Sequence, residues 1–156
     1  MQIINKQSKI DKARDLFLGG YNCAQSVFAA YAQEAGLTES QALKLSSGFG
    51  GGIGGMRNVC GAITGMMMVV GAHGGYDDAA DMQGKKHLYA AEQALVAKFE
   101  ADFETIECRE LLKRNHIVAS GEPSERTPEY YKQRPCARYV ETCAGMIADE
   151  LNEKAE

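Results

Sequence analysis

The segment 48–65 constrains the fold of this chain more than any other stretch. Six of its first eight residues are glycine, and Cys60 follows before an apolar run rich in methionine and valine. Glycine loses the most backbone freedom on folding, so this density indicates backbone with positive φ or close approach to another group. A flexible linker is the alternative interpretation. Phe49, Ile53 and Met56 argue against it, because a solvated glycine linker lacks such side chains.

The rest of the chain has the periodicity and punctuation of helices. Apolar residues recur at spacings of three and four, between polar capping residues and glycines. The three prolines all lie after position 120, and no strand pattern or internal repeat is present. The 156 residues are enough for one hydrophobic core. The sequence therefore predicts a single all-α domain, 1–156, of about six helices with the glycine-rich loop before the fourth.

Capping residues and breakers set the expected helix ranges. The expected caps are Ser8, Asn22, Thr38 and either Asp77 or Asp78. The expected helices run from Ser8 to the Gly19–Gly20 pair, then over 23–35, 39–47, 58 or 60 to 72, 77 or 78 to 102, a short stretch from about 105, and 135–151. Gly121, Pro123 and Pro128 predict an irregular loop over about 115–134.

Composition excludes several classes of protein. The net charge is −4 and no dense stripe of lysine and arginine occurs, so nucleic acid is not an expected partner. The longest apolar run, 66–72, is too short to span a membrane, and the N-terminus lacks the apolar core of a signal peptide. We therefore expect a cytoplasmic protein. In such a protein five cysteines indicate catalytic, redox or metal-binding use.

Four of the five cysteines fall in the first turn of a predicted helix: Cys23, Cys60, Cys108 and Cys136. Unpaired backbone N–H groups and the helix dipole favour an anion there, and a thiolate is one. These four are candidates both for catalytic thiols and for metal ligands. The alternative is that they are buried packing residues, since free cysteine is often buried. Cys143 lies in mid-helix, where packing is the expected role.

No C-x-x-C pair occurs, so any site must be assembled from separate helices, and we expect the four cysteines to converge. We single out Cys60 as the most reactive thiol, because the glycines leave it accessible and Arg57 adds positive charge. Gly52, Gly54 and Arg57 are candidates for binding a cofactor beside it.

The neighbours of these cysteines carry a resemblance that covers nearly the whole chain. The stretches concerned are Gly20–Val27, Gly51–Gly54 leading to Cys60–Gly65, Cys108–Leu112 and Cys136–Val140. In these stretches the chain resembles the family of redox-active proteins named after the signature C_GCAxxG_C_C. The resemblance implies a small helical domain with four signature cysteines, which here are Cys23, Cys60, Cys108 and Cys136. Cys143 lies outside the signature.

Three functions remain open at this stage. The first is a redox or electron-transfer protein whose four cysteines cycle between dithiol and disulfide or hold an iron–sulfur cluster. The second is a structural zinc site with four cysteine ligands. The third is a non-enzymatic helical binding module, as a monomer or a homodimer, with buried cysteines. The redox partner that the first function requires is not identified by the sequence.

Overall fold

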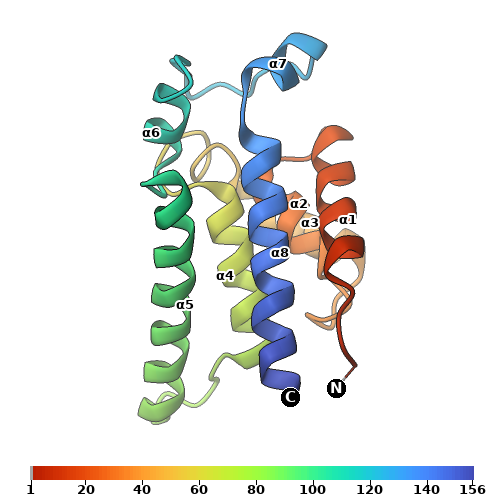
Figure 1. Cartoon of the computed structure of the whole chain (residues 1–156), viewed down its shortest axis with the longest axis vertical. Coiled ribbons are helices and arrows are strands. Elements are labelled where there is room, and N and C mark those ends of the chain that lie inside the picture. Colours follow the sequence, from red (N-terminus) through yellow and green to blue (C-terminus); the bar gives the residue numbers. More distant parts are fainter. Residues whose placement is uncertain (1) are drawn as a thin grey trace.

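A computed structural model describes residues 2–156 and confirms the all-α class (Figure 1). Within these residues there are eight α-helices, one short 3-10 turn and no strand, and six of the helices have eight or more residues. The elements are α1 (Lys6–Leu18), α2 (Cys23–Ala30), α3 (Glu39–Ser46), η1 (Ser47–Phe49), α4 (Gly61–Gly74), α5 (Met82–Phe103), α6 (Cys108–Lys113), α7 (Pro128–Gln133) and α8 (Cys136–Ala155). The expected ranges include α6, the short helix near 105, whereas α7 lies in the segment expected to be an irregular loop.

Two predicted caps are present with the expected side-chain chemistry. The Asn22 side chain accepts a hydrogen bond from the backbone of Gln25, and the Gln25 side chain accepts from the backbone of Asn22. Thr38 and Gln41 form the same reciprocal pair at the start of α3. Each pair satisfies two backbone N–H groups that the first helical turn leaves without partners.

Two other predicted caps are wrong. Asn5, not Ser8, caps α1, because the Asn5 side chain accepts from the backbone N–H of Ser8 at 3.0 Å. Asp81, not Asp77 or Asp78, caps α5 through the same three-residue spacing. In both cases several polar residues near the helix start were possible caps, and local spacing does not choose between them.

The second helix is shorter than predicted. It ends at Ala30, and turns cover 31–36 before Gly36 adopts a φ of 74°. Tyr31 is fully buried there, and its hydroxyl donates a 2.6 Å hydrogen bond to the carbonyl of Ala144 in α8. This long-range contact coincides with the end of the regular helix, and no local pattern predicts it.

The predicted loop over 115–134 is also only partly right. It contains α7, whose first residue is Pro128. The Thr127 side chain accepts from the backbone N–H of Tyr130 at 3.2 Å and caps the helix. Proline at the first helical position loses no hydrogen bond, since its N–H would have been unpaired anyway. The sequence pattern favours Pro128 as a helix breaker, whereas Pro128 is the first residue of α7.

The core lies between α1, α2, α4 and α8, with α3 against α2 and α5 outside α4 and α8 (Figure 1). The two ends of the chain meet at one end of the bundle, where the Ile4 backbone N–H donates to Asn152 Oδ1 at 2.8 Å. At the opposite end the glycine-rich loop lies near α6 and the start of α8. In the described part of the chain, no helix has both the length and the apolarity needed to cross a bilayer.

Helices α2 and α4 approach closely along the glycine face of α4. A Cβ atom on Gly65 would lie 2.8 Å from the carbonyl oxygen of Ala24 and 3.1 Å from Val27 Cβ. Gly61 is in the same position against the Ala24 backbone, where an added Cβ would lie 2.9 Å from the nitrogen. Two glycines spaced four residues apart leave this face of α4 without side chains, and this allows the backbone of α2 to come close.

We expect Gly65→Ala to destabilise the protein although alanine is the better helix former. The higher helix propensity of alanine should raise the free energy of unfolding by about 1 kcal/mol. The added methyl group would push α2 and α4 apart, which should lower the free energy of unfolding by about 1–3 kcal/mol. Gly71→Ala in the same helix is the matched control, because an added Cβ meets nothing within 4 Å. Urea unfolding should show a loss of stability for the first variant and a gain for the second. Equal changes would contradict the close packing of α2 and α4.

Candidate functional site

The glycine-rich loop contains a left-handed turn of backbone. All five residues from 51 to 55 have φ between 55° and 78°, including Ile53 at 69°. The turn is closed by backbone hydrogen bonds from Arg57 N–H to Gly51 and from Asn58 N–H to Gly52, at 2.9 and 2.8 Å. The prediction that these glycines serve positive φ is therefore confirmed.

Beyond the turn, the chain pairs with the segment that precedes α6. The Cys60 N–H donates to the Ile106 carbonyl at 2.7 Å, and the Cys108 N–H donates to the Asn58 carbonyl at 2.6 Å. Val59 and Glu107 form an isolated antiparallel bridge between them. These bonds hold the start of α4 next to the start of α6, so that Cys60 and Cys108 become neighbours despite their separation in sequence.

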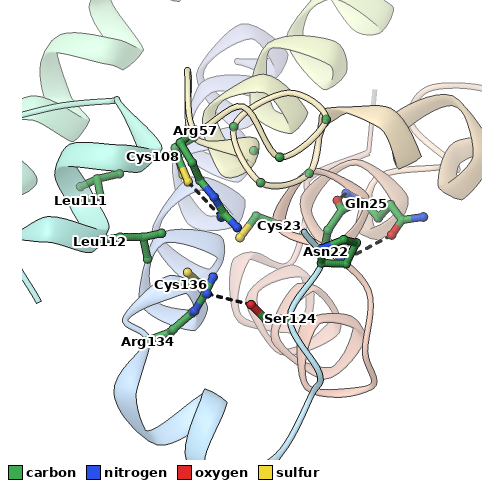
Figure 2. A pocket seen from close by; sticks show the side chains of 18 of the residues that line it. Asn22, Cys23, Gln25, Arg57, Cys108, Leu111, Leu112, Ser124, Arg134 and Cys136 are labelled. Atoms are coloured by element: carbon green, nitrogen blue, oxygen red, sulfur yellow. Dashed lines mark hydrogen bonds between the residues drawn. The ribbon is translucent and has the colours of Figure 1, made fainter. Parts of the chain in front are cut away.

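The four signature cysteines all lie at helix starts, as predicted. Cys23, Cys108 and Cys136 are the first residues of α2, α6 and α8, and Cys60 is the N-cap of α4. All four line one cavity of about 530 Å³ under the glycine-rich loop. Figure 2 shows Cys23, Cys108 and Cys136 arranged around it. The convergence expected from the sequence is present, whereas the chemical roles of these residues stay a prediction.

The Cys23 and Cys136 thiols interact within the cavity and shift each other's pKa. Their hydrogen bond lowers the pKa of Cys136 and raises that of Cys23 well above the ordinary value. The positive charges of Arg134, Arg126 and Arg57 also lower the pKa of Cys136, against the opposing effect of burial. Cys136 is the thiol of the five whose pKa is lowered, so it is the one best able to exist as a thiolate.

The burial of Cys60 contradicts the expectation that the glycines leave this thiol accessible. Cys60 is 4% exposed. Burial, followed by repulsion from Cys136, raises its pKa to about 12. The backbone N–H groups at the start of α4 do lower the pKa, but they do not offset the loss of hydration. The position at a helix start was predicted correctly, whereas the burial was not.

Arg57 contacts Cys108 rather than Cys60. Its Nη1 lies 3.7 Å from Cys108 Sγ (Figure 2). Its Nε and Nη2 donate to the Ser120 carbonyl at 3.1 and 3.0 Å. Burial raises the pKa of Cys108, and the Arg57 guanidinium partly opposes this. Arg57 therefore connects the glycine-rich loop, Cys108 and the segment before α7.

Cys143 does not line the cavity and is fully buried in α8. Burial raises its pKa well above the ordinary value. This environment fits the packing role that its mid-helix position predicted, and it makes Cys143 a useful control thiol.

Sequence reasoning missed the polar wall that α7 and its flanks contribute. Gly52 and Gly54 line the cavity as expected, but so do Arg126, Tyr130 and Arg134, which were assigned to an irregular loop. Both guanidiniums stack on the Tyr130 ring: the Cζ atoms of Arg126 and Arg134 each lie 4.6 Å from its centroid. Arg126, Tyr130 and Arg134 follow one another at intervals of four residues, and Thr127 and Pro128 are typical of a helix start. This pattern could have identified the three residues as one surface.

The thiols as placed do not form a metal site. All five cysteines are free. Across residues 2–156, no three Cys, His, Asp or Glu side chains gather closely enough to hold one metal ion. Arg57 also contacts the Cys108 sulfur that a four-cysteine ligand set would need. A cluster would require these side chains to move closer together, and iron–sulfur binding stays a prediction.

The fold and the cavity define a class of protein: an all-α domain in which cysteines from four helix starts meet beneath a glycine-rich turn. The model of the family described as "Putative redox-active protein (C_GCAxxG_C_C)" matches residues 21–150, and the chain belongs to this family. The match includes all four signature cysteines and both segments that form the cavity roof and wall. No curated protein and no solved structure matches the chain.

Proposed function

We propose that this protein is a thiol–disulfide redox protein in which Cys23 and Cys136 cycle between dithiol and disulfide. The observation that carries the proposal is the interaction of these two thiols in one cavity, with opposite shifts in pKa. Such asymmetry suits two successive roles. A thiolate is the nucleophile in disulfide exchange, whereas a partner that stays protonated does not compete for the first attack.

The thiol–disulfide exchange takes place in two steps, and its atoms and electrons balance. The Cys136 thiolate attacks one sulfur of a disulfide substrate, forms a mixed disulfide and releases the other half as a thiolate. Cys23 then passes its proton to that thiolate and attacks Cys136 Sγ, which forms the Cys23–Cys136 disulfide and releases the second half. The substrate gains two electrons and the protein loses two. Arg134, Arg126 and Arg57 stabilise the initial thiolate by charge.

Oxidation of the reduced protein with one equivalent of bis(hydroxyethyl) disulfide tests this proposal. We expect peptide mapping to find a Cys23–Cys136 linkage, and the same linkage in Cys143→Ala. In Cys23→Ser the second step is blocked, so a mixed disulfide should accumulate on Cys136. Oxidation that links other cysteines, or thiols that stay reduced until the protein unfolds, would overturn the proposal.

A metal-binding function is the second candidate, since four cysteine side chains share the lining of one cavity. Anaerobic purification with metal and sulfide analysis separates the two. Iron with sulfide and visible absorption would support an iron–sulfur protein, and colourless protein with one zinc would support a structural site. Metal-free protein that forms the Cys23–Cys136 disulfide would support the dithiol function.

A further inference from the structure

The cavity carries positive charge in a chain whose net charge is −4. Three arginines line it, Arg57, Arg126 and Arg134, against a single acidic side chain, Glu122. Within residues 2–156 none of these arginines forms an ion pair with a carboxylate; the ion pairs lie elsewhere on the molecule. Guanidiniums that share a cavity without a protein counter-ion are suited to bind an anion from solution.

Arg126 lacks a partner for a buried donor. Its Nη1 atom is buried and, in the described part of the chain, makes no hydrogen bond. The guanidinium is held instead by aromatic rings, with Cζ 4.9 Å from the centroid of Phe17 and 4.6 Å from that of Tyr130. Ring faces attract the charge but accept no conventional hydrogen bond. An unpaired buried donor costs free energy, so an acceptor on a bound ligand would stabilise this atom.

Arg134 is held on the same wall, beside the reactive pair. Its Cζ lies 4.6 Å from the Tyr130 centroid, and its Nη2 donates to Ser124 Oγ at 3.0 Å. Figure 2 shows the Arg134 side chain beside Cys136. Stacking thus holds both guanidiniums before any ligand arrives, and a hydrogen bond also holds Arg134. Arg57 is less available, because its donors already contact Ser120 and Cys108.

We propose that the substrate of this cavity is a small anionic disulfide, whose carboxylate Arg126 and Arg134 bind while its sulfur–sulfur bond meets Cys136. A volume of about 530 Å³ is that of a small-molecule site rather than a protein docking groove. The proposal rests on the proposed thiol–disulfide function and names its substrate class. The electron balance is that of the exchange given above, with the anionic disulfide as oxidant and two molecules of its thiol as products.

Three disulfides of similar size and different charge test the proposal. Reduced full-length protein is oxidised with dithiodiglycolate, which carries two carboxylates, with bis(hydroxyethyl) disulfide, which is neutral, and with cystamine, which carries two ammonium groups. We expect the dianion to react about tenfold faster than the neutral compound, after correction for their intrinsic rates with a free thiol, and cystamine to be slowest. Added salt should narrow the difference. Equal corrected rates, or a preference for cystamine, would overturn the proposal.

Variants locate the preference in the two arginines. Arg134→Gln and Arg126→Gln should each lower the ratio of the dithiodiglycolate rate to the neutral rate about threefold, and the double variant should remove the preference of about tenfold. The ratio is the relevant quantity because both substrates depend equally on the Cys136 thiolate. Arg138→Gln is the matched control, since Arg138 also stacks on a ring, Phe103, but does not line the cavity. An unchanged ratio in both cavity variants, or an equal loss in the control, would count against the site.

A sulfur-free anion separates this inference from the redox function. Adipate should raise the melting temperature of Cys136→Ser but not that of Cys136→Ser combined with Arg126→Gln and Arg134→Gln. Adipate binding in a protein whose thiols never oxidise would retain the anion site and reject the redox function. If the native protein oxidises without charge preference and does not bind adipate, the redox function is retained and the anion site is rejected.

Discussion

We expect iodoacetamide to label the native protein at mildly acidic pH, and we expect the replacement of Cys136 with serine to abolish this labelling. Only the thiolate reacts, and Cys136 is the thiol whose pKa is lowered, by the Cys23 hydrogen bond and the cavity arginines. At such a pH a lowered pKa leaves a larger thiolate fraction, so Cys136 should react at least about tenfold faster than the other four thiols. Mass-spectrometric mapping of the labelled peptides measures this directly.

The pH profile gives the sign of the effect. Labelling of Cys136 should persist as the pH falls below the ordinary thiol range and decline only near its lowered pKa, whereas Cys108 labelling should require higher pH because its pKa is raised. Cys143→Ala is the control and should leave the labelling unchanged, because that thiol is buried with a raised pKa. Preferential labelling of Cys60 would restore the expectation from the sequence and contradict the assignment of Cys136.

Gly52→Ala is expected to destabilise the glycine-rich loop strongly. Its φ of 67° alone costs an L-residue about 1–2 kcal/mol. In addition, the new Cβ would lie 2.5 Å from the backbone nitrogen of Asn58 and 2.7 Å from Arg57 Cα. Backbone atoms yield less easily than the end of a side chain, so the total loss should be about 3 kcal/mol in urea unfolding.

Gly52→Ala should also change the contacts in the cavity. Moving the Arg57 backbone separates its guanidinium from Cys108, which should slow Cys108 labelling because the arginine lowers that pKa. Gly54→Ala is the matched control: its φ is 55°, but the nearest atom to an added Cβ is 4.0 Å away. It should cost about 1 kcal/mol of strain and leave Cys108 labelling unchanged. Equal losses in the two variants would show that strain alone, and not the contact with Asn58, sets the effect.

Much of the fold could be predicted locally because helix formation depends on neighbours three and four residues away. The reciprocal caps at Asn22 and Thr38 each depend on a glutamine three residues later, and the sequence predicted both caps correctly. The need for positive φ at the glycine-rich turn is equally local, since side chains disfavour that backbone conformation. The errors, at Ser8, at 31–36 and at α7, arose where two local signals competed or where a distant contact decided.

The sequence by itself determined the all-α class, the left-handed glycine turn and the placement of four cysteines at helix starts, because each depends on the chain within a turn or two. The tertiary structure decided the direction in which the pKa of each thiol shifts. Burial outweighs the helix start at Cys60, while Arg126 and Arg134, brought to Cys136 by α7, favour its thiolate. Desolvation and charge act through space, and the distances on which they depend exist only once the helices have packed.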